Sequence, residues 1–296
     1  MAFSMLWVGS GRSPAFHVGS TWICDKYFSM DYLSGLLLGA VQGLTEFLPV
    51  SSSGHLILAR TVFGLGSDHG LAVDAVLQLA TILAVTVYFW SDLWRLAGSS
   101  FGLVLRRPVG REDRTLLYAI VVGTVPAAVL GLLLESYMET VFRSVWLVLV
   151  TLVLGAGLMW LAERFARQDR PLTVRSGLGI GLFQCLALVP GMSRSGSTIS
   201  GGLFLGLNRA AATRFSFLLA WPIITASGLK KLLDLSSEGV LHEFGPGLML
   251  GFAVAFAVGL AAIHFLIRFL RSHTLMAFVW YRLALAAVLA VMLLAG

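Results

Sequence analysis

The sequence predicts an all-α polytopic membrane protein with about six spanning helices and two re-entrant helical hairpins, arranged as an inverted-topology repeat. Its 296 residues are 57% hydrophobic and only 12% charged, whereas a soluble domain carries about 25% charged residues. Apolar runs of bilayer-crossing length recur along the chain, and one polar motif occurs twice. Such runs could not all be hidden from water in a single soluble core.

The apolar runs are close to the ~20 residues that cross a bilayer as a helix. The clearest are Leu71–Trp90, Thr115–Leu134, Val145–Leu161, Gly247–Ile267 and Leu275–Ala295. Together with a weaker stretch, they predict spans at about 71–90, 115–134, 145–162, 211–229, 247–267 and 275–295. Residues 1–30 lack this pattern and the features of a signal peptide. We expect them to form a poorly ordered extension before a single membrane domain, 31–296.

Two polar motifs indicate an internal duplication. The segment "GAVQGLTEFLPVSSSGHLIL" (39–58) resembles "GLFQCLALVPGMSRSGSTIS" (181–200), and the two align without a gap at an offset of 181 − 39 = 142. Gln, Ser, Ser and Gly then coincide at the paired positions 42/184, 51/193, 53/195 and 54/196. We interpret residues 31–163 as the first repeat and 176–296 as the second.

The apolar pieces beside each motif are too short to cross the bilayer. They lie at 32–45 and 56–65 around the first motif, and at 177–189 and 199–207 around the second. Apolar stretches of about 10–14 residues suggest re-entrant segments, and irregular backbone at membrane depth is tolerated only where protein or a watery cavity covers it. Each motif is therefore predicted to be the tip of a broken hairpin.

Three predicted spans follow each hairpin, and an odd number inverts the second repeat relative to the first. Loop charges support this topology. Loop 91–114 has five arginines against three acids, and loop 163–175 has four against two. The pairs Arg209/Arg214 and Arg268/Arg271 fall on the same predicted side, which the positive-inside rule assigns to the cytoplasm. The hairpins should enter from opposite faces and meet near the middle.

Glu46 is the only acidic residue of the first hairpin. An ionisable group at membrane depth costs several kcal/mol unless it is paired or wet, so function is its default interpretation. Gln42 lies four residues earlier on the same helical face, from which both side chains can reach one cation or one water. A structural alternative is that Glu46 pairs with Arg194 and holds the two hairpins together.

Hydroxyl groups and an imidazole follow this carboxylate. Ser51, Ser52 and Ser53 precede His55. A neutral imidazole at such a place could accept a serine proton or, once protonated, assist a leaving group.

Arg194 stands in the second motif, within "PGMSRSGST" (190–198). Small residues leave backbone N–H groups accessible, and a half-helix beginning near Ser197 would point its positive end at the loop, which favours an anion. The planar guanidinium suits phosphate oxygens. An arginine that closes the loop on backbone carbonyls is the structural alternative.

This combination of groups favours phosphoryl transfer, in which cationic groups stabilise phosphate oxygens while a nucleophile attacks in line. The sequence has no G-x-x-x-x-G-K-[ST] nucleotide loop. We therefore expect the phosphate to be attached to a lipid-soluble molecule, and expect no nucleic-acid partner, since the net charge of +6 lies mostly in short loops.

The motifs resemble the undecaprenyl-diphosphate phosphatases of the bacitracin-resistance type. The resemblance covers about residues 31–296 and rests on "QGLTEFLPVSSSGHL" (42–56), "PGMSRSGSTISGGLFLGL" (190–207) and "FVWYRL" (278–283). It implies a multi-pass enzyme of the bacterial cytoplasmic (inner) membrane that removes the terminal phosphate from a C55 isoprenyl diphosphate. This reaction recycles the carrier lipid for peptidoglycan synthesis, with a divalent cation (Mg²⁺ or Ca²⁺) assisting.

The resemblance also implies site residues. The family's acidic motif begins with Glu or Gln; here it begins with Gln42, followed by Glu46, so one possible metal-binding carboxylate is absent. The serine–histidine pair falls on Ser52 and His55, and the phosphate-binding loop on 191–198. Our hypothesis places Glu46, Ser52, His55 and Arg194 in catalysis and a cation on Glu46 and Gln42. Substrate-binding residues would be Gln42, Ser51, Ser53, Gly191, Ser193, Ser195, Gly196 and Thr198.

Several questions stay open at this point. Either Ser52 or a water could attack, with His55 or Glu46 as base. A transporter or flippase of a phosphorylated lipid is the alternative function, because inverted repeats with broken helices are typical of transporters. Membrane lipids and a homo-oligomer are possible partners. The aromatic residues near span ends predict an interfacial belt, namely Trp90, Trp94, Trp160 and Tyr281.

Overall fold

The computed structural model describes residues 30–63, 70–134, 144–237 and 245–295. Within these ranges all regular structure is helical, which confirms the predicted all-α class. The predicted N-terminal extension, apart from Met30, lies outside the described residues.

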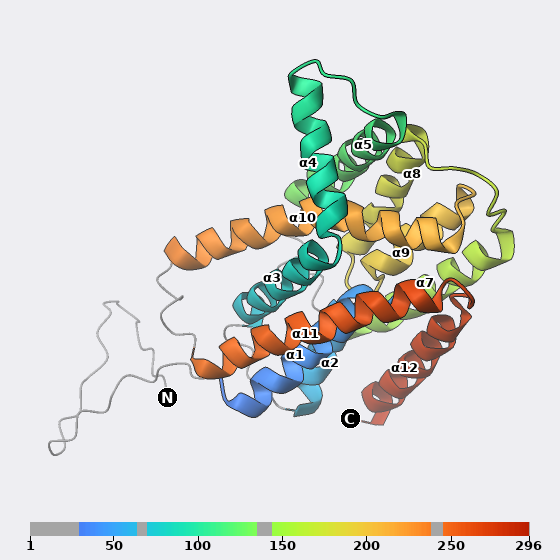
Figure 1. The fold of residues 1–296 in the computed structure, drawn as a ribbon. Helices are drawn as coiled ribbons and strands as arrows, with labels where there is room; N and C mark the ends of the chain where they lie inside the picture. The colour runs from blue at the N-terminus through green and yellow to red at the C-terminus, as the bar shows by residue number, and fades with distance from the viewer. Residues whose placement is uncertain (1–29, 64–69, 135–143, 238–244, 296) are drawn as a thin grey trace, which may run out of the picture.

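The first half of the chain contributes a broken hairpin followed by further helices (Figure 1). Its helices are α1 (Tyr32–Phe47), α2 (Ser52–Phe63), α3 (Gly70–Tyr88), α4 (Trp90–Val104), α5 (Arg111–Leu133) and α7 (Val145–Phe165). The second half begins with another broken hairpin. Its elements are α8 (Val174–Cys185), the short 3₁₀ helix η2 (Leu186–Leu188), α9 (Arg194–Phe204), α10 (Arg209–Ser237), α11 (Pro246–Phe269) and α12 (Met276–Ala295).

Four of the described helices, α5, α7, α11 and α12, are long and apolar enough to cross a membrane. The pair α3 and α4 qualifies as a fifth if it is counted as one bent span. These helices make the chain a multi-pass membrane protein. The sixth predicted span corresponds to α10, which does not meet the same criterion and carries Arg214, Lys230 and Lys231 among its residues.

The prediction of a loop over residues 91–114 was wrong. Most of this stretch is helix α4, which turns by 81° from α3 at a break around Phe89. The arginines of this stretch led to the prediction of a loop. However, α4 also has apolar residues at helical spacing, and Leu96 and Ser99 are buried. The helix therefore forms because one of its faces packs on the protein.

Each hairpin packs against a helix of the other half. A Cβ placed on Gly39 of α1 would lie 2.3 Å from the carbonyl oxygen of Gly251 in α11. At the equivalent position of the second repeat (39 + 142 = 181), a Cβ on Gly181 of α8 would lie 2.2 Å from the carbonyl oxygen of Gly123 in α5. Because no side chain fits between these backbones, the two halves interlock closely.

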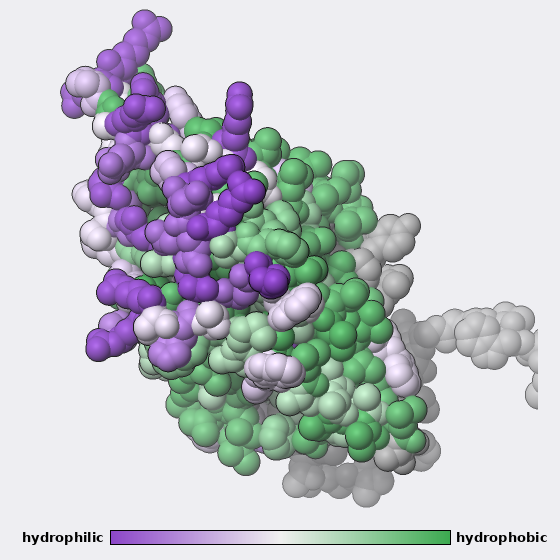
Figure 2. Space-filling view, turned by 90° about the vertical axis from the view of Figure 1, so that its right-hand side faces the viewer, coloured by the Kyte–Doolittle hydropathy of each residue, from purple (hydrophilic) through white to green (hydrophobic). Residues whose placement is uncertain are grey.

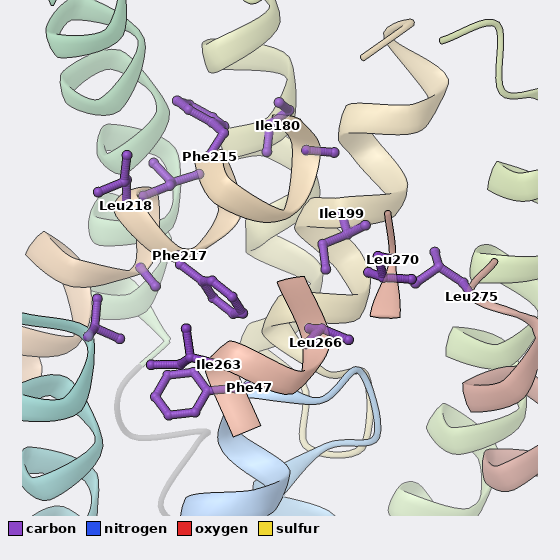
Figure 3. Packing of buried hydrophobic residues seen from close by; sticks show 14 of the residues in the cluster. Phe47, Ile180, Ile199, Phe215, Phe217, Leu218, Ile263, Leu266, Leu270 and Leu275 are labelled. Carbon is purple, nitrogen blue, oxygen red and sulfur yellow. The ribbon is translucent and has the colours of Figure 1, made fainter. Parts of the chain in front are cut away.

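A shared hydrophobic core fixes the end of α1. Phe47, its last residue, is fully buried, and its ring meets Phe217 of α10 edge-on with 5.6 Å between centroids. Figure 3 shows Phe47 beside Ile263 of α11 in the same cluster. Burying an aromatic side chain of this size stabilises the fold by about 1.5–3 kcal/mol. Glu46, the residue before it, is therefore held in place by helices of the second half.

The surface of the molecule is divided by polarity. Figure 2 shows hydrophilic side chains gathered toward one end of the visible face and hydrophobic side chains over most of the remainder. Exposed apolar residues such as Leu132, Leu133 and Met249 are ordinary on a surface that faces lipid. This distribution agrees with basic loops that share one side of the membrane.

Candidate active site

The two hairpins break at equivalent positions and in the same way. Ser51 and Ser193 adopt left-handed backbone conformations with φ of 77° and 70°, which residues other than glycine seldom do. Each hydroxyl then accepts the backbone N–H three residues later, from Gly54 at 3.4 Å and from Gly196 at 3.2 Å. The duplication seen in the sequence is thus repeated in the geometry of the tips.

Helix α9 begins three residues earlier than predicted. We expected its start near Ser197, but Arg194 is already its first residue and Ser193 is its N-cap. Serine is a favoured N-cap because its hydroxyl satisfies a free N–H group of the first turn. This earlier start puts the side chain of Arg194 in the first turn, where the helix dipole attracts anions.

The tips of the two hairpins touch, as the topology predicted. The Ser195 hydroxyl donates to the carbonyl oxygen of Leu48 at 3.1 Å. Nη2 of Arg194 lies 3.4 Å from the carbonyl oxygen of Glu46. These contacts join residues 147 and 148 positions apart in the sequence.

The carboxylate of Glu46 lies at the centre of this junction. Its Oε2 accepts hydrogen bonds from Nε2 of Gln42 at 3.1 Å and from the hydroxyl of Ser52 at 2.7 Å. Its Oε1 accepts from Nη2 of Arg194 at 3.0 Å, and only 6% of its side chain is exposed. Ser52 and Arg194 are equivalent residues of the two repeats (52 + 142 = 194). One carboxylate therefore receives hydrogen bonds from the same position in both hairpins.

Arg194 retains hydrogen-bonding capacity beyond this ion pair. Its Nε and Nη1 are buried and have no partner among the described residues. A buried polar group without a partner destabilises by about 1–3 kcal/mol, so these donors favour a ligand that accepts hydrogen bonds. Their position on the first turn of α9 makes an anion the best-suited ligand.

His55 is bonded to other groups than Ser52. Its Nδ1 lies 2.7 Å from the carbonyl oxygen of Ser51, and its Nε2 lies 2.8 Å from the hydroxyl of Tyr281. A carbonyl only accepts, so Nδ1 carries the proton and the neutral ring accepts from Tyr281 at Nε2. Tyr281, which we expected only in the interfacial belt, thus positions His55. Ser52 instead donates to Glu46.

Arg282 is a site residue that sequence reasoning missed. It is completely buried in α12 and donates only to backbone carbonyls. Its acceptors are Pro49 on the first tip, Gly191 and Met192 on the second, and Thr151 and Leu152 on α7, at 2.6–3.4 Å. A lone arginine in the apolar run 275–295 was the available signal, because a charge at that depth needs partners.

Several predicted substrate-binding residues have structural contacts. Gly191 has φ of 92°, and a Cβ there would lie 1.9 Å from Oγ1 of Thr151. The buried Thr198 hydroxyl bonds to Ser216 at 2.6 Å and to the carbonyl oxygen of Arg194 at 2.8 Å. Their contacts shape the second tip around Arg194.

The predicted serines pair within their own tips. The hydroxyls of Ser51 and Ser53 are 3.3 Å apart, and those of Ser193 and Ser195 are 3.2 Å apart. The Gly196 contact is the N–H cap already described. Of these residues, Ser53 is exposed at the surface, so its hydroxyl is open to a ligand.

The residues around Glu46 can hold a divalent cation only if the substrate supplies further ligands to it. No group of three or more His, Cys, Asp or Glu side chains that could hold a metal occurs in the described part of the chain. Glu46 supplies the one carboxylate of the cluster, and the Gln42 amide donates to it. Mg²⁺ commonly binds through one or two carboxylates together with substrate phosphates. That is the arrangement this cluster can support.

The fold and the site together define a class of multi-pass membrane proteins. In this class, two broken hairpins meet and bring a carboxylate and a guanidinium into contact. The family model for the bacitracin resistance protein BacA matches residues 35–288. The chain therefore belongs to the BacA family.

Several relatives of the chain carry the same name. Proteins named undecaprenyl-diphosphatase from Micrococcus luteus and Rubrobacter xylanophilus are each 45% identical, over 273 and 270 residues, with 90% of this chain and 99% of each relative covered. The one from Mycolicibacterium smegmatis is 46% identical over 274 residues, with 90% and 98% covered. The similarity extends over nearly the whole length of these proteins.

Proposed function

We propose that this chain is an undecaprenyl-diphosphatase of the bacterial cytoplasmic membrane. It hydrolyses undecaprenyl diphosphate to undecaprenyl phosphate and inorganic phosphate, and so returns the carrier lipid to peptidoglycan synthesis. Membership in the BacA family and the name shared by its relatives support this activity. The observation that carries it is the line of contacts from Ser52 through Glu46 to Arg194.

The diphosphate binds at the first turn of α9. Nε and Nη1 of Arg194 donate to phosphate oxygens, and the positive end of the helix adds to their attraction. The guanidinium already neutralises Glu46 through its Nη2. It can therefore hold the phosphate and the catalytic carboxylate at the same time.

Ser52 is the nucleophile that the geometry favours. Its Oγ forms a bond to the terminal phosphorus while Glu46, at 2.7 Å, accepts the hydroxyl proton. The bond from that phosphorus to the bridging oxygen breaks, and undecaprenyl phosphate leaves with the electron pair. Water then displaces phosphate from phosphoserine, while the proton returns from Glu46 to Ser52 and the released phosphate keeps the protons of the water.

His55 acts by positioning the first tip, through its hydrogen bond to the carbonyl oxygen of Ser51, next to the nucleophile. A divalent cation, Mg²⁺ or Ca²⁺, held by Glu46 and Gln42 together with the diphosphate would neutralise phosphate charge. Undiminished turnover in EDTA, after metal has been removed from substrate and protein, would exclude this role of the cation.

The test is phosphate release from undecaprenyl diphosphate by the detergent-solubilised protein. We expect Arg194→Ala to lower kcat/KM by about 10²–10³, the effect of removing a group that stabilises transition-state charge. Arg175→Ala is the matched control, because Arg175 is exposed in the first turn of α8, the other helix of the same hairpin. Full activity of Arg194→Ala would refute the proposed site.

Lipid translocation is a second candidate function, favoured by the two equivalent hairpin tips that meet between the halves. Hydrolysis proceeds in detergent, whereas translocation needs a sealed bilayer. Vesicles that contain a Ser52→Ala variant, which keeps the phosphate-binding Arg194, and labelled undecaprenyl phosphate separate the two activities. Transfer of the label between leaflets without hydrolysis would establish translocation.

A further inference from the structure

A cleft lies where the ends of α3, α10 and α11 come together. It consists of two adjoining cavities of about 400 and 430 Å³, which share Tyr88, Ile267 and Arg271 in their walls. The first cavity also includes His264 and Arg268, and the second includes Arg214. None of these residues belongs to the cluster around Glu46, so the cleft is separate from the candidate active site.

The cleft is strongly cationic. No carboxylate is among its lining residues. Arg214 is paired with Asp92, at 2.5 Å. Arg268 and Arg271, at the end of α11, are exposed, and neither side chain forms an ion pair or hydrogen bond within the described residues. Two guanidinium groups are therefore directed to a ligand or to solvent.

Apolar and hydrogen-bonding groups lie beside this charge. The hydroxyl of Tyr88 is 3.2 Å from Nδ1 of His264, and both side chains line the first cavity. Ile267 and Phe89 supply apolar wall. The neighbouring residue Phe265 is 50% exposed on the same helix. A ligand with an anionic head and hydrocarbon chains matches all of these groups.

We propose that this cleft binds the phosphate headgroup of an anionic phospholipid. Arg268 and Arg271 contact the phosphate, Tyr88 and His264 offer hydrogen bonds, and the acyl chains lie on the apolar surface beside the cleft. Basic pockets between membrane helices on the cytoplasmic side are typical sites for anionic headgroups. The predicted topology puts this end of α11 on that side, where anionic lipid is adjacent.

Native mass spectrometry of the detergent-solubilised protein tests the proposal, with phosphatidylglycerol compared with phosphatidylcholine of the same chains. We expect the wild-type protein to prefer phosphatidylglycerol. Arg268→Gln combined with Arg271→Gln should reduce that preference by about 10- to 30-fold, since each basic side chain contributes roughly 1 kcal/mol. The double variant must elute as a monodisperse species, like the wild type.

The matched control is Arg164→Gln combined with Arg167→Gln. These arginines are also exposed, have the same spacing, and flank the end of α7 as the other pair flanks the end of α11. The control should keep the wild-type preference, and Arg268→Lys with Arg271→Lys should restore most of it. Equal loss in both glutamine variants would show a general charge effect and overturn the proposal.

Two competitors distinguish the source of the phosphate. Inorganic phosphate at millimolar concentration should displace phosphatidylglycerol poorly, because it lacks the acyl chains. Efficient displacement by inorganic phosphate would mark a small-anion site, and preferential binding of undecaprenyl phosphate would mark a product site. Either result would overturn the assignment to an anionic phospholipid.

Discussion

The first hairpin, α1 and α2, and the second, α8 and α9, have the same backbone turn but different side chains where chemistry is expected. Both turn at a serine with positive φ, and in both that serine caps the following helix. Gln42 of the first hairpin donates to Glu46. Its equivalent, Gln184, is also buried, but Leu188 takes the place of the glutamate, and the amide atoms of Gln184 have no described partner.

The comparison shows how a duplicated scaffold can build an asymmetric site. Had both hairpins kept a glutamate, two carboxylates would repel each other and the phosphate in a medium of low dielectric constant. With one glutamate and one arginine, the charges neutralise each other across the junction, and the arginine retains donors for an anion. The backbone supplies the placement, and the substitutions at equivalent positions supply the chemistry.

The largest expected effect distinguishes two hydroxyl groups on helix α2 of the first hairpin. Ser52→Ala should lower kcat by about 10³ or more, because a nucleophile that acts as a unit with its base is not replaced by its neighbours. Thr61→Ala, a control on the same helix α2, should retain activity within about threefold, since its exposed hydroxyl bonds only to the carbonyl oxygen of Ile57. Phosphorus-labelled substrate should trap phosphoserine at Ser52. Full turnover by Ser52→Ala would leave water as the nucleophile.

The next substitution is expected to loosen both hairpin tips together. Arg282→Met removes the donors to five carbonyls, which we expect to destabilise the protein by about 3–5 kcal/mol. The midpoint of thermal unfolding in detergent should fall by about 10 °C. Arg175→Met, an exposed control, should leave it unchanged. An unchanged midpoint for Arg282→Met would show that the tips are held by other contacts.

A conservative substitution at Arg194 tests whether its positive charge alone accounts for its role opposite Glu46. Arg194→Lys keeps the positive charge opposite Glu46 but loses the Nε and Nη1 donors that have no described partner, so we expect kcat/KM to fall by about 10- to 100-fold. The thermal midpoint should hardly change, because the ion pair persists. If Arg194→Lys were fully active, charge alone would account for the role of Arg194.

The smallest effect is expected where α12 supports the first tip. Tyr281→Phe removes one hydrogen bond to His55, worth about 0.5–1.5 kcal/mol, and should lower kcat about 3- to 10-fold. The double variant Tyr281→Phe, His55→Ala should be no worse than His55→Ala alone, because both residues act through the same contact. If the effects of the two substitutions on kcat multiplied, Tyr281 would have a role independent of His55.

Much of this arrangement could be predicted from the sequence, because it rests on local patterns. Apolar runs predicted the helices α5, α7, α11 and α12, and repeated serines predicted both tips. The sequence also offered the pairing of Glu46 with Arg194 as an alternative, since buried charges require partners. The structure contains that pair, in which Nε and Nη1 of the guanidinium have no partner among the described residues.

By itself, the sequence determined the membrane character, the duplication and the two charged residues, because hydropathy and motif spacing are properties of short segments. Only the tertiary structure decided which groups meet. Tyr281 bonds to a histidine 226 positions away, Arg282 spans both tips, and Ser52 donates to Glu46 while His55 faces another helix. Such contacts depend on how the two halves pack together, with helix backbones in close contact at glycine residues. This packing cannot be read from any single segment of the sequence.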